Sequence, residues 1–288
     1  MFLKITVIAW NTLVELIRQK VFYIILVFAL CAIGSSIFMA RLSFQEEFQM
    51  LKDVCLGAMS VFTSLLAILA TASFLPKDLE ERTIYTLLSK PVPRFAYLMG
   101  KLGGIIGLLF LFTLLMSGVF VLILWLRESA VLATTAAQFA DHPEAKEELH
   151  AALQAVRDST FNINLLPGIV IIFVKSALLA AMTLFISTFS TSSLFTVMIS
   201  AAIYFIGHLQ AVARDYWLEG MTGDWWKTIL VAIVALIFPD LQAFNLADDV
   251  IAGAAIPLSL FIKTFALGWT YVAVYFALAA FVFSGREL

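Results

Sequence analysis

Six long apolar runs constrain what this chain can fold into more than any other feature. A membrane-crossing helix needs about 20 apolar residues, because it rises about 1.5 Å per residue through a hydrocarbon layer about 30 Å thick. Six runs meet this length: residues 21–40, 54–75, 101–126, 166–189, 194–212 and 257–283. With 62% hydrophobic residues and a mean hydropathy of +0.99, the sequence predicts an all-α polytopic membrane protein with six transmembrane helices in one domain, residues 1–288.

A seventh apolar run, from Thr228 to Phe238, is too short to cross. Its eleven residues span about 16 Å as a helix, and Pro239 and Asp240 end it. We therefore expect residues 226–253 to form a re-entrant or interfacial element at the outer side. The alternative is a seven-span topology, in which this run crosses and the C-terminus lies outside.

A polar segment, LPKDLEERTIYTLLSKPVPRFAYLMGK, connects the second span to the third. Pro76 can begin a helix, whereas Pro91 and Pro93 cannot continue one, so the segment predicts a helix over residues 76–90. This helix would be amphipathic. Its polar side consists of Asp78, Arg82, Tyr85 and Ser89, and its apolar side consists of Leu79, Ile84, Leu87 and Leu88. An alternative is a helix anchored at the lipid headgroups through Lys77, Arg82, Lys90 and Arg94.

The distribution of Lys and Arg predicts the orientation of the chain. If both termini are cytoplasmic, the basic residues are about twice as dense in the inner segments as in the outer ones, as the positive-inside rule requires. The helix over residues 76–90 is then cytoplasmic. Residues 127–165 form an external loop, and the sequence from Asp141 to Val156 predicts a short amphipathic helix within it.

Residues 1–20 predict an N-terminal interfacial helix. A thin polar stripe runs along it, made of Lys4, Asn11, Glu15 and Arg18. The apolar run that follows Lys20 is too long for a cleaved signal peptide.

Two overlapping G-x-x-x-G patterns begin the third span. Gly100 pairs with Gly104 and Gly103 with Gly107. Such glycines allow close approach of another helix, which can belong to the same chain or to a second copy.

Lys175 is a charge inside the fourth span. A lipid-facing lysine at the bilayer centre costs about 2.5–3.5 kcal/mol, so we expect Lys175 to face the bundle interior, a partner or a translocation path. The alternative is that it extends toward the outer interface. His208, near the outer end of the fifth span, can titrate near neutral pH or be a satisfied interface histidine.

No pattern in the chain predicts an enzyme, a metal site or a cofactor of its own. Neither a phosphate-binding loop nor a hydrolase or metalloprotease motif is present, and the net charge of −2 gives no reason to expect nucleic acid. Cys31 and Cys55 are interpreted as small buried hydrophobic residues. The five acidic and histidine residues near the external helix are interpreted as a solvated face: His142, Glu144, Glu147, Glu148 and His150.

The polar segment resembles the first cytoplasmic loop of ABC-2 type permeases, the membrane subunits of ATP-binding cassette exporters, in their NosY-like and Gld-type branch. The residues that carry the resemblance are Leu79 to Ile84, Leu87 to Arg94, and Gly100 with Lys101. Weaker similarities extend over the chain: Glu15 and Arg18 before the first span, Phe238-Pro239-Asp240-Leu241 with Phe244-Asn245, and the ending Arg286-Glu287-Leu288.

The resemblance implies that residues 76–90 form a coupling helix that contacts a separate ATPase subunit, which binds ATP and Mg. The residues that it assigns to this contact are Asp78, Glu80, Glu81, Arg82, Tyr85, Lys90 and Arg94. It further implies a second permease copy, as a homodimer or as a heterodimer with a similar chain, in the inner (plasma) membrane. The expected function is export of an unidentified substrate.

An alternative of another class is a membrane scaffold or intramembrane enzyme that works without an ATPase. It would use Lys175, Asp240, Asp248 or Asp249. The adjacent Asp248 and Asp249 point about 100° apart on a helix, so they cannot easily share a proton or a metal. Charge reversal at Glu81 and Arg82 separates the two hypotheses, because only the exporter needs these charges for binding an ATPase.

Overall fold

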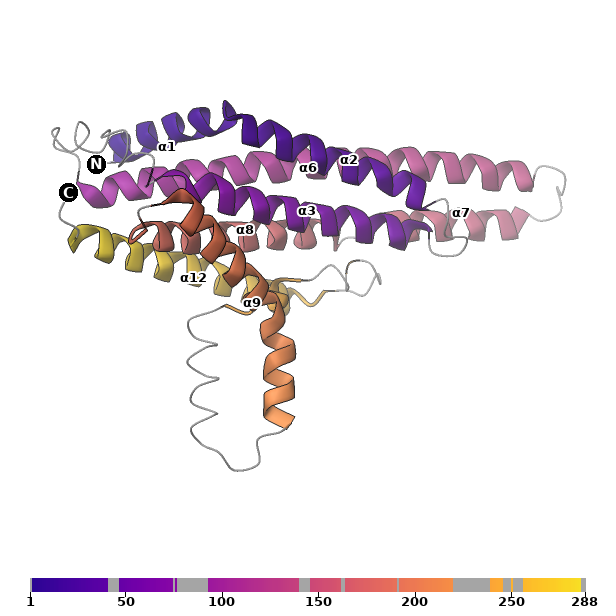
Figure 1. Ribbon diagram of the computed structural model, residues 1–288. Helices are drawn as coiled ribbons and strands as arrows, with labels where there is room; N and C mark the ends of the chain where they lie inside the picture. The colour runs from indigo at the N-terminus through magenta and orange to yellow at the C-terminus, as the bar shows by residue number, and fades with distance from the viewer. Residues whose placement is uncertain are drawn as a thin grey trace.

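The computed structural model describes residues 2–40, 47–74, 76, 93–139, 146–161, 164–190, 192–219, 239–245, 250 and 256–285. Within these ranges the chain is helical and contains no strand (Figure 1). The elements are α1 (Phe2–Ile17), α2 (Lys20–Ala40), α3 (Glu47–Ala72), α6 (Arg94–Gln138), α7 (Lys146–Thr160), α8 (Leu165–Ser187), α9 (Ser193–Glu219), the short 3₁₀ helix η1 (Gln242–Phe244) and α12 (Leu258–Gly285).

Six helices of the described chain are long and apolar enough to cross a membrane, which confirms the all-α, six-helix prediction. They are α2, α3, α6, α8, α9 and α12. The start of α1 and the end of α12 lie at the same end of the bundle, which we call the terminus end (Figure 1). The end of α6 and the start of α7 lie at the opposite end, which we call the hairpin end (Figure 1).

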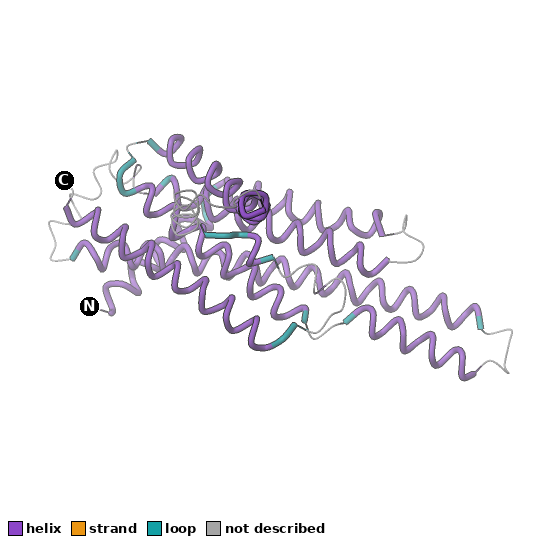
Figure 2. The backbone as a smooth tube through the Cα atoms, turned by 90° about the horizontal axis from the view of Figure 1, so that it is seen from below, coloured by secondary structure: helices purple, strands orange, loops and turns teal. Residues whose placement is uncertain are grey.

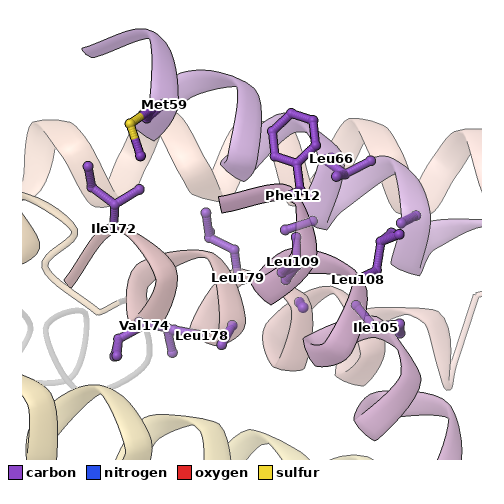
Figure 3. Close-up of a cluster of buried hydrophobic side chains, with 14 of the residues drawn as sticks. Met59, Leu66, Ile105, Leu108, Leu109, Phe112, Ile172, Val174, Leu178 and Leu179 are labelled. Atoms are coloured by element: carbon purple, nitrogen blue, oxygen red, sulfur yellow. The ribbon is translucent and has the colours of Figure 1, made fainter. Parts of the chain in front are cut away.

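Helix α8 is the centre of the bundle. It packs against α3, α6, α9 and α12, and 17 of its residues are buried. Its sequence is apolar on every side, as expected of a helix surrounded by others. Figure 3 shows Leu178 and Leu179 of α8 in one cluster with Leu109 and Phe112 of α6 and Leu66 of α3.

Helices α2 and α12, in contrast, have large apolar side chains on their outer faces. Phe28 of α2 is 63% exposed and Phe281 of α12 is 78% exposed. A continuous apolar exterior of this kind is what contact with lipid chains requires. Cys31 lies on the exposed side of α2, so the interpretation of this cysteine as buried was wrong, whereas Cys55 is buried.

The third predicted span continues well beyond its expected end at Leu126. Helix α6 has 45 residues and ends at Gln138, and α7 packs back against it to form a helical hairpin (Figures 1 and 2). Residues 127–138 contain neither Gly nor Pro, so nothing in their sequence stops the helix. The expected amphipathic helix of the external loop is therefore one arm of this hairpin.

Two polar contacts attach the hairpin to α3. Arg127 forms an ion pair with Glu47 at the start of α3. The ammonium of Lys52 donates a hydrogen bond to the backbone carbonyl of Ser159 at 2.7 Å. These contacts explain why α3 begins at Glu47, seven residues before the apolar run predicted to cross.

Two predicted elements lie mostly outside the described residues. The coupling helix over residues 76–90 is described only at Pro76, which is buried. The re-entrant region over residues 226–253 is described only at residues 239–245 and at Val250.

Candidate functional site

The terminus end of the bundle holds both flanks of the predicted coupling segment. Residues Asp78, Glu80, Glu81, Arg82, Tyr85 and Lys90 lie outside the described part of the chain. Phe74 precedes this segment and Lys101 follows it, and the Lys101 ammonium lies 4.4 Å from the centre of the Phe74 ring. The end of α3 and the beginning of α6 are therefore in direct contact.

Arg94, the first residue of α6, binds the last turn of α12. Its guanidinium donates to the carbonyl of Ser284 at 2.8 Å and to that of Phe283 at 3.3 Å. Carbonyls at a helix C-terminus lack intrahelical partners and carry partial negative charge, so an arginine satisfies both needs. The family resemblance assigned Arg94 to a contact with an ATPase subunit, and the structure places it against α12.

The glycines of α6 pack against α1 of the same chain. A Cβ atom at Gly100 would lie 2.6 Å from Ile8, and one at Gly104 would lie 2.6 Å from Thr12 and 2.7 Å from the carbonyl oxygen of Ala9. Gly103 and Gly107 are looser, with nearest atoms at 3.6 and 3.8 Å. The contact sequence shows that α1 and α6 run parallel.

The remaining surface of α1 has two distinct faces. An exposed apolar stripe consists of Leu3, Val7, Trp10 and Val14. The polar positions Lys4, Asn11 and Arg18 are exposed on a neighbouring side, with Glu15 half-buried among them. A helix with one protein-facing, one apolar and one polar face is suited to the boundary between lipid and water.

A second cluster of polar groups lies in the middle of the bundle around Lys175. This residue is close to the midpoint of α8 and only 2% exposed. Its ammonium donates to Ser60 Oγ on α3 at 3.1 Å and to His208 Nε2 on α9 at 2.9 Å. The sequence left several positions open for the Lys175 side chain, and the structure places it in the bundle interior.

When the His208 ring is neutral, its second ring nitrogen decides which tautomer it adopts. Nδ1 lies 2.9 Å from the backbone carbonyl of Tyr204, and a carbonyl can only accept a hydrogen bond. Nδ1 therefore carries the hydrogen in this pair, and Nε2 offers its lone pair to the Lys175 ammonium. The geometry fits a neutral imidazole beside a charged lysine.

Tyr204 and Asp240 complete the surroundings of this pair. The Tyr204 ring packs against the His208 ring with centroids 4.3 Å apart and planes tilted by 53°. The Tyr204 hydroxyl forms a hydrogen bond with the Ser64 side chain of α3. Asp240 has a half-buried carboxyl group that interacts electrostatically with His208. Sequence analysis did not identify Ser60, Ser64 or Tyr204, because hydroxyls are common in apolar helices and give no signal there.

The segment that contains Asp240 is attached to α9 next to His208. The Leu241 amide donates to the Gly207 carbonyl at 3.0 Å. A Cβ atom at Gly207 would lie 2.7 Å from Leu241 Cγ and 3.1 Å from the Pro239 carbonyl oxygen. Only glycine permits this approach, so Gly207 fixes the position of residues 239–241 on α9.

Lys175 and His208 can together carry one positive charge. Two unit positive charges about 4 Å apart repel by about 4 kcal/mol at an effective dielectric constant near 20. Lys175 and His208 are closer than this and cannot both be charged at low cost. The described residues contain no group of His, Cys, Asp and Glu side chains that could hold a metal ion.

Comparisons with known proteins identify no family for this chain. No protein-family profile matches it, and no curated protein sequence matches it significantly.

Proposed function

We propose that this chain is the membrane-spanning permease subunit of an ATP-binding cassette exporter of the ABC-2 type. It would couple ATP hydrolysis by a separate nucleotide-binding subunit to export of a substrate. The observation that carries this proposal is the packing of the terminus end, where both flanks of residues 77–92 contact each other and two further helices. A segment attached in this way can transmit a displacement to the bundle.

The contacts define the route of that transmission. Movement of the coupling helix acts on the end of α3 and on the start of α6, which touch through Phe74 and Lys101. Helix α6 acts on α12 through Arg94 and on α1 through Gly100 and Gly104. Closure of an ATPase pair around ATP would thus bias the relative positions of four helices between two arrangements.

The proposal includes a defined assembly. Six spans and one coupling helix make half of a transporter, so a second permease copy and two ATPase subunits complete it. Both termini and residues 76–90 lie in the cytoplasm, and the chain resides in the inner (plasma) membrane. ATP and Mg bind to the partner subunit, and residues 226–253 cover the outer end of the path.

Co-purification of the ATPase tests the proposal. The tagged chain is extracted in mild detergent from its native cells, and associated proteins and ATPase activity are measured for the wild type and for Glu81→Lys with Arg82→Glu. We expect the wild type to retain an ATPase subunit and the double variant to lose at least about nine-tenths of it, since it reverses two adjacent charges of the expected contact.

A matched charge reversal at the hairpin end provides the control. Glu148 and Arg157 lie on exposed positions of α7, so Glu148→Lys with Arg157→Glu should leave the ATPase bound. If the intact, folded wild type brings down no ATPase, the exporter proposal fails and an ATPase-independent membrane scaffold or intramembrane enzyme replaces it.

A further inference from the structure

Lys175 connects three membrane helices. Its ammonium binds Ser60 of α3 and His208 of α9, while the lysine itself belongs to α8. Because Lys175 is buried and each contact crosses between helices, the position of α9 depends on this link. No carboxylate among the described residues neutralises the ammonium, so the hydrogen bonds to Ser60 and His208 are its principal stabilisation.

We propose that Lys175 and His208 form a proton-binding site that carries one positive charge and releases α9 from α3 and α8 when it binds a second proton. In the observed state His208 Nε2 accepts a hydrogen bond from the Lys175 ammonium. A proton from the solvent that binds to Nε2 occupies this lone pair and removes the acceptor. Two cations then face each other at hydrogen-bond distance, and separation of α9 from α8 relieves their repulsion.

The groups around His208 decide how it responds to protons. Helix α8 presents Lys175, α9 presents Tyr204, and the segment over residues 239–245 presents Asp240. Helix α3 presents the uncharged hydroxyls of Ser60 and Ser64, and α6 and α12, which also pack on α8, add no charge near Lys175 among the described residues. Asp240 is half-buried, and its segment is attached to α9 through the hydrogen bond from Leu241 to Gly207, so this carboxyl group stays close to His208.

Helix α9 has two features that allow such a movement. In its most apolar stretch 22% of the residues are buried, against 78% in the corresponding stretch of the segment that includes α8. Two buried polar atoms of α9, Ser200 Oγ and Gln210 Oε1, have no hydrogen-bond partner within the described structure. In its packed position α9 therefore has few buried residues and leaves polar groups without hydrogen bonds. Both features lower the free-energy cost of moving α9 away from α3 and α8.

A distance measurement between α3 and α9 tests this inference. Spin labels are attached at the exposed positions Val61 of α3 and Leu209 of α9 by substitution to cysteine, with Cys31→Ser and Cys55→Ala as background. The full chain is placed in lipid nanodiscs, and pulsed electron resonance gives the distance distribution. Samples with only one label per chain show which distances arise between two copies of the chain.

We expect the wild-type distance to depend on pH. Between about pH 8 and about pH 5, a range that brackets the usual titration of histidine, the short-distance population should fall by at least about half. His208→Gln retains an oxygen acceptor for Lys175 and cannot be protonated, so its distance should stay short at both values. His150→Gln, at an exposed histidine on α7, is the matched control and should keep the wild-type transition.

Lys175→Met provides an independent variant, because without the ammonium no repulsion follows protonation of His208. Its distance distribution should be the same at both pH values. An unchanged wild-type distance, or a transition that persists in His208→Gln or Lys175→Met, overturns the inference. This switch lies in the membrane bundle and needs no ATPase, so its outcome is separable from the co-purification result.

Discussion

The ends of the bundle and its centre hold buried or half-buried cations in different ways. At the hairpin end Lys52 donates to a backbone carbonyl, and at the terminus end Arg94 donates to two carbonyls of α12. At the centre Lys175 donates to two side chains, and one of them is an imidazole. A carbonyl accepts a hydrogen bond at any physiological pH, whereas an imidazole stops accepting once it is protonated.

This difference divides the molecule into permanent and conditional contacts. The contacts at the ends attach α6 to α12 and the hairpin to α3, and they do not depend on the protonation of His208. The central contact can be lost without unfolding either end. Such an arrangement would suit the proposed exporter, in which helices move as units.

The largest expected effect concerns the close packing at the terminus end. In Gly104→Ala the new methyl group would lie 2.7 Å from the Ala9 carbonyl oxygen, so α1 must shift, and we expect a loss of about 1–3 kcal/mol in stability. Thermal unfolding in detergent measures this loss. Gly107→Ala is the matched control, because its methyl group would meet atoms only at 3.8 Å or beyond; equal unfolding temperatures would show that α1 is not packed as described.

A smaller effect is expected at the link between α6 and α12. Arg94→Gln removes a charged donor from the carbonyls of Phe283 and Ser284, and we expect a loss of about 1 kcal/mol because the group is partly solvated. The amides in the last turn of α12 should exchange faster in the variant than in the wild type, and the ratio of the two rates should be the same at pH 5 and at pH 8. Lys263→Gln, at an exposed position on the same helix, should leave the exchange rates of these amides unchanged. A ratio of variant to wild-type rates that differs strongly between the two pH values would contradict a permanent contact.

The smallest effect on stability is expected at the centre. Lys175→Met removes a buried charge and keeps an unbranched side chain of similar length, so stability at neutral pH should stay within about 1 kcal/mol of the wild type. Thermal unfolding of the variant beside the wild type measures this. A loss as large as that of Gly104→Ala would mean that Lys175 serves mainly to hold the bundle together.

The sequence predicted the helical architecture because length and apolarity alone decide which segments can cross a bilayer. The runs that begin near Lys20, Leu166 and Pro257 appear as α2, α8 and α12, each within a few residues of its expected bounds. The extensions of α3 back to Glu47 and of α6 to Gln138 were missed. Their charged and polar residues resemble a loop in composition, and the contacts of α3, α6 and α7 with one another stabilise them as helix.

For the candidate site, the sequence identified the unusual residues and the structure decided their partners. Lys175 and His208 stand out in apolar runs, but 33 residues separate them, and Ser60 lies 115 residues before Lys175. Similarly, the G-x-x-x-G patterns indicated a close helix neighbour, and only the folded chain shows that α1 fills this position. Periodicity describes one helix at a time, whereas these pairings depend on how the helices lie beside one another.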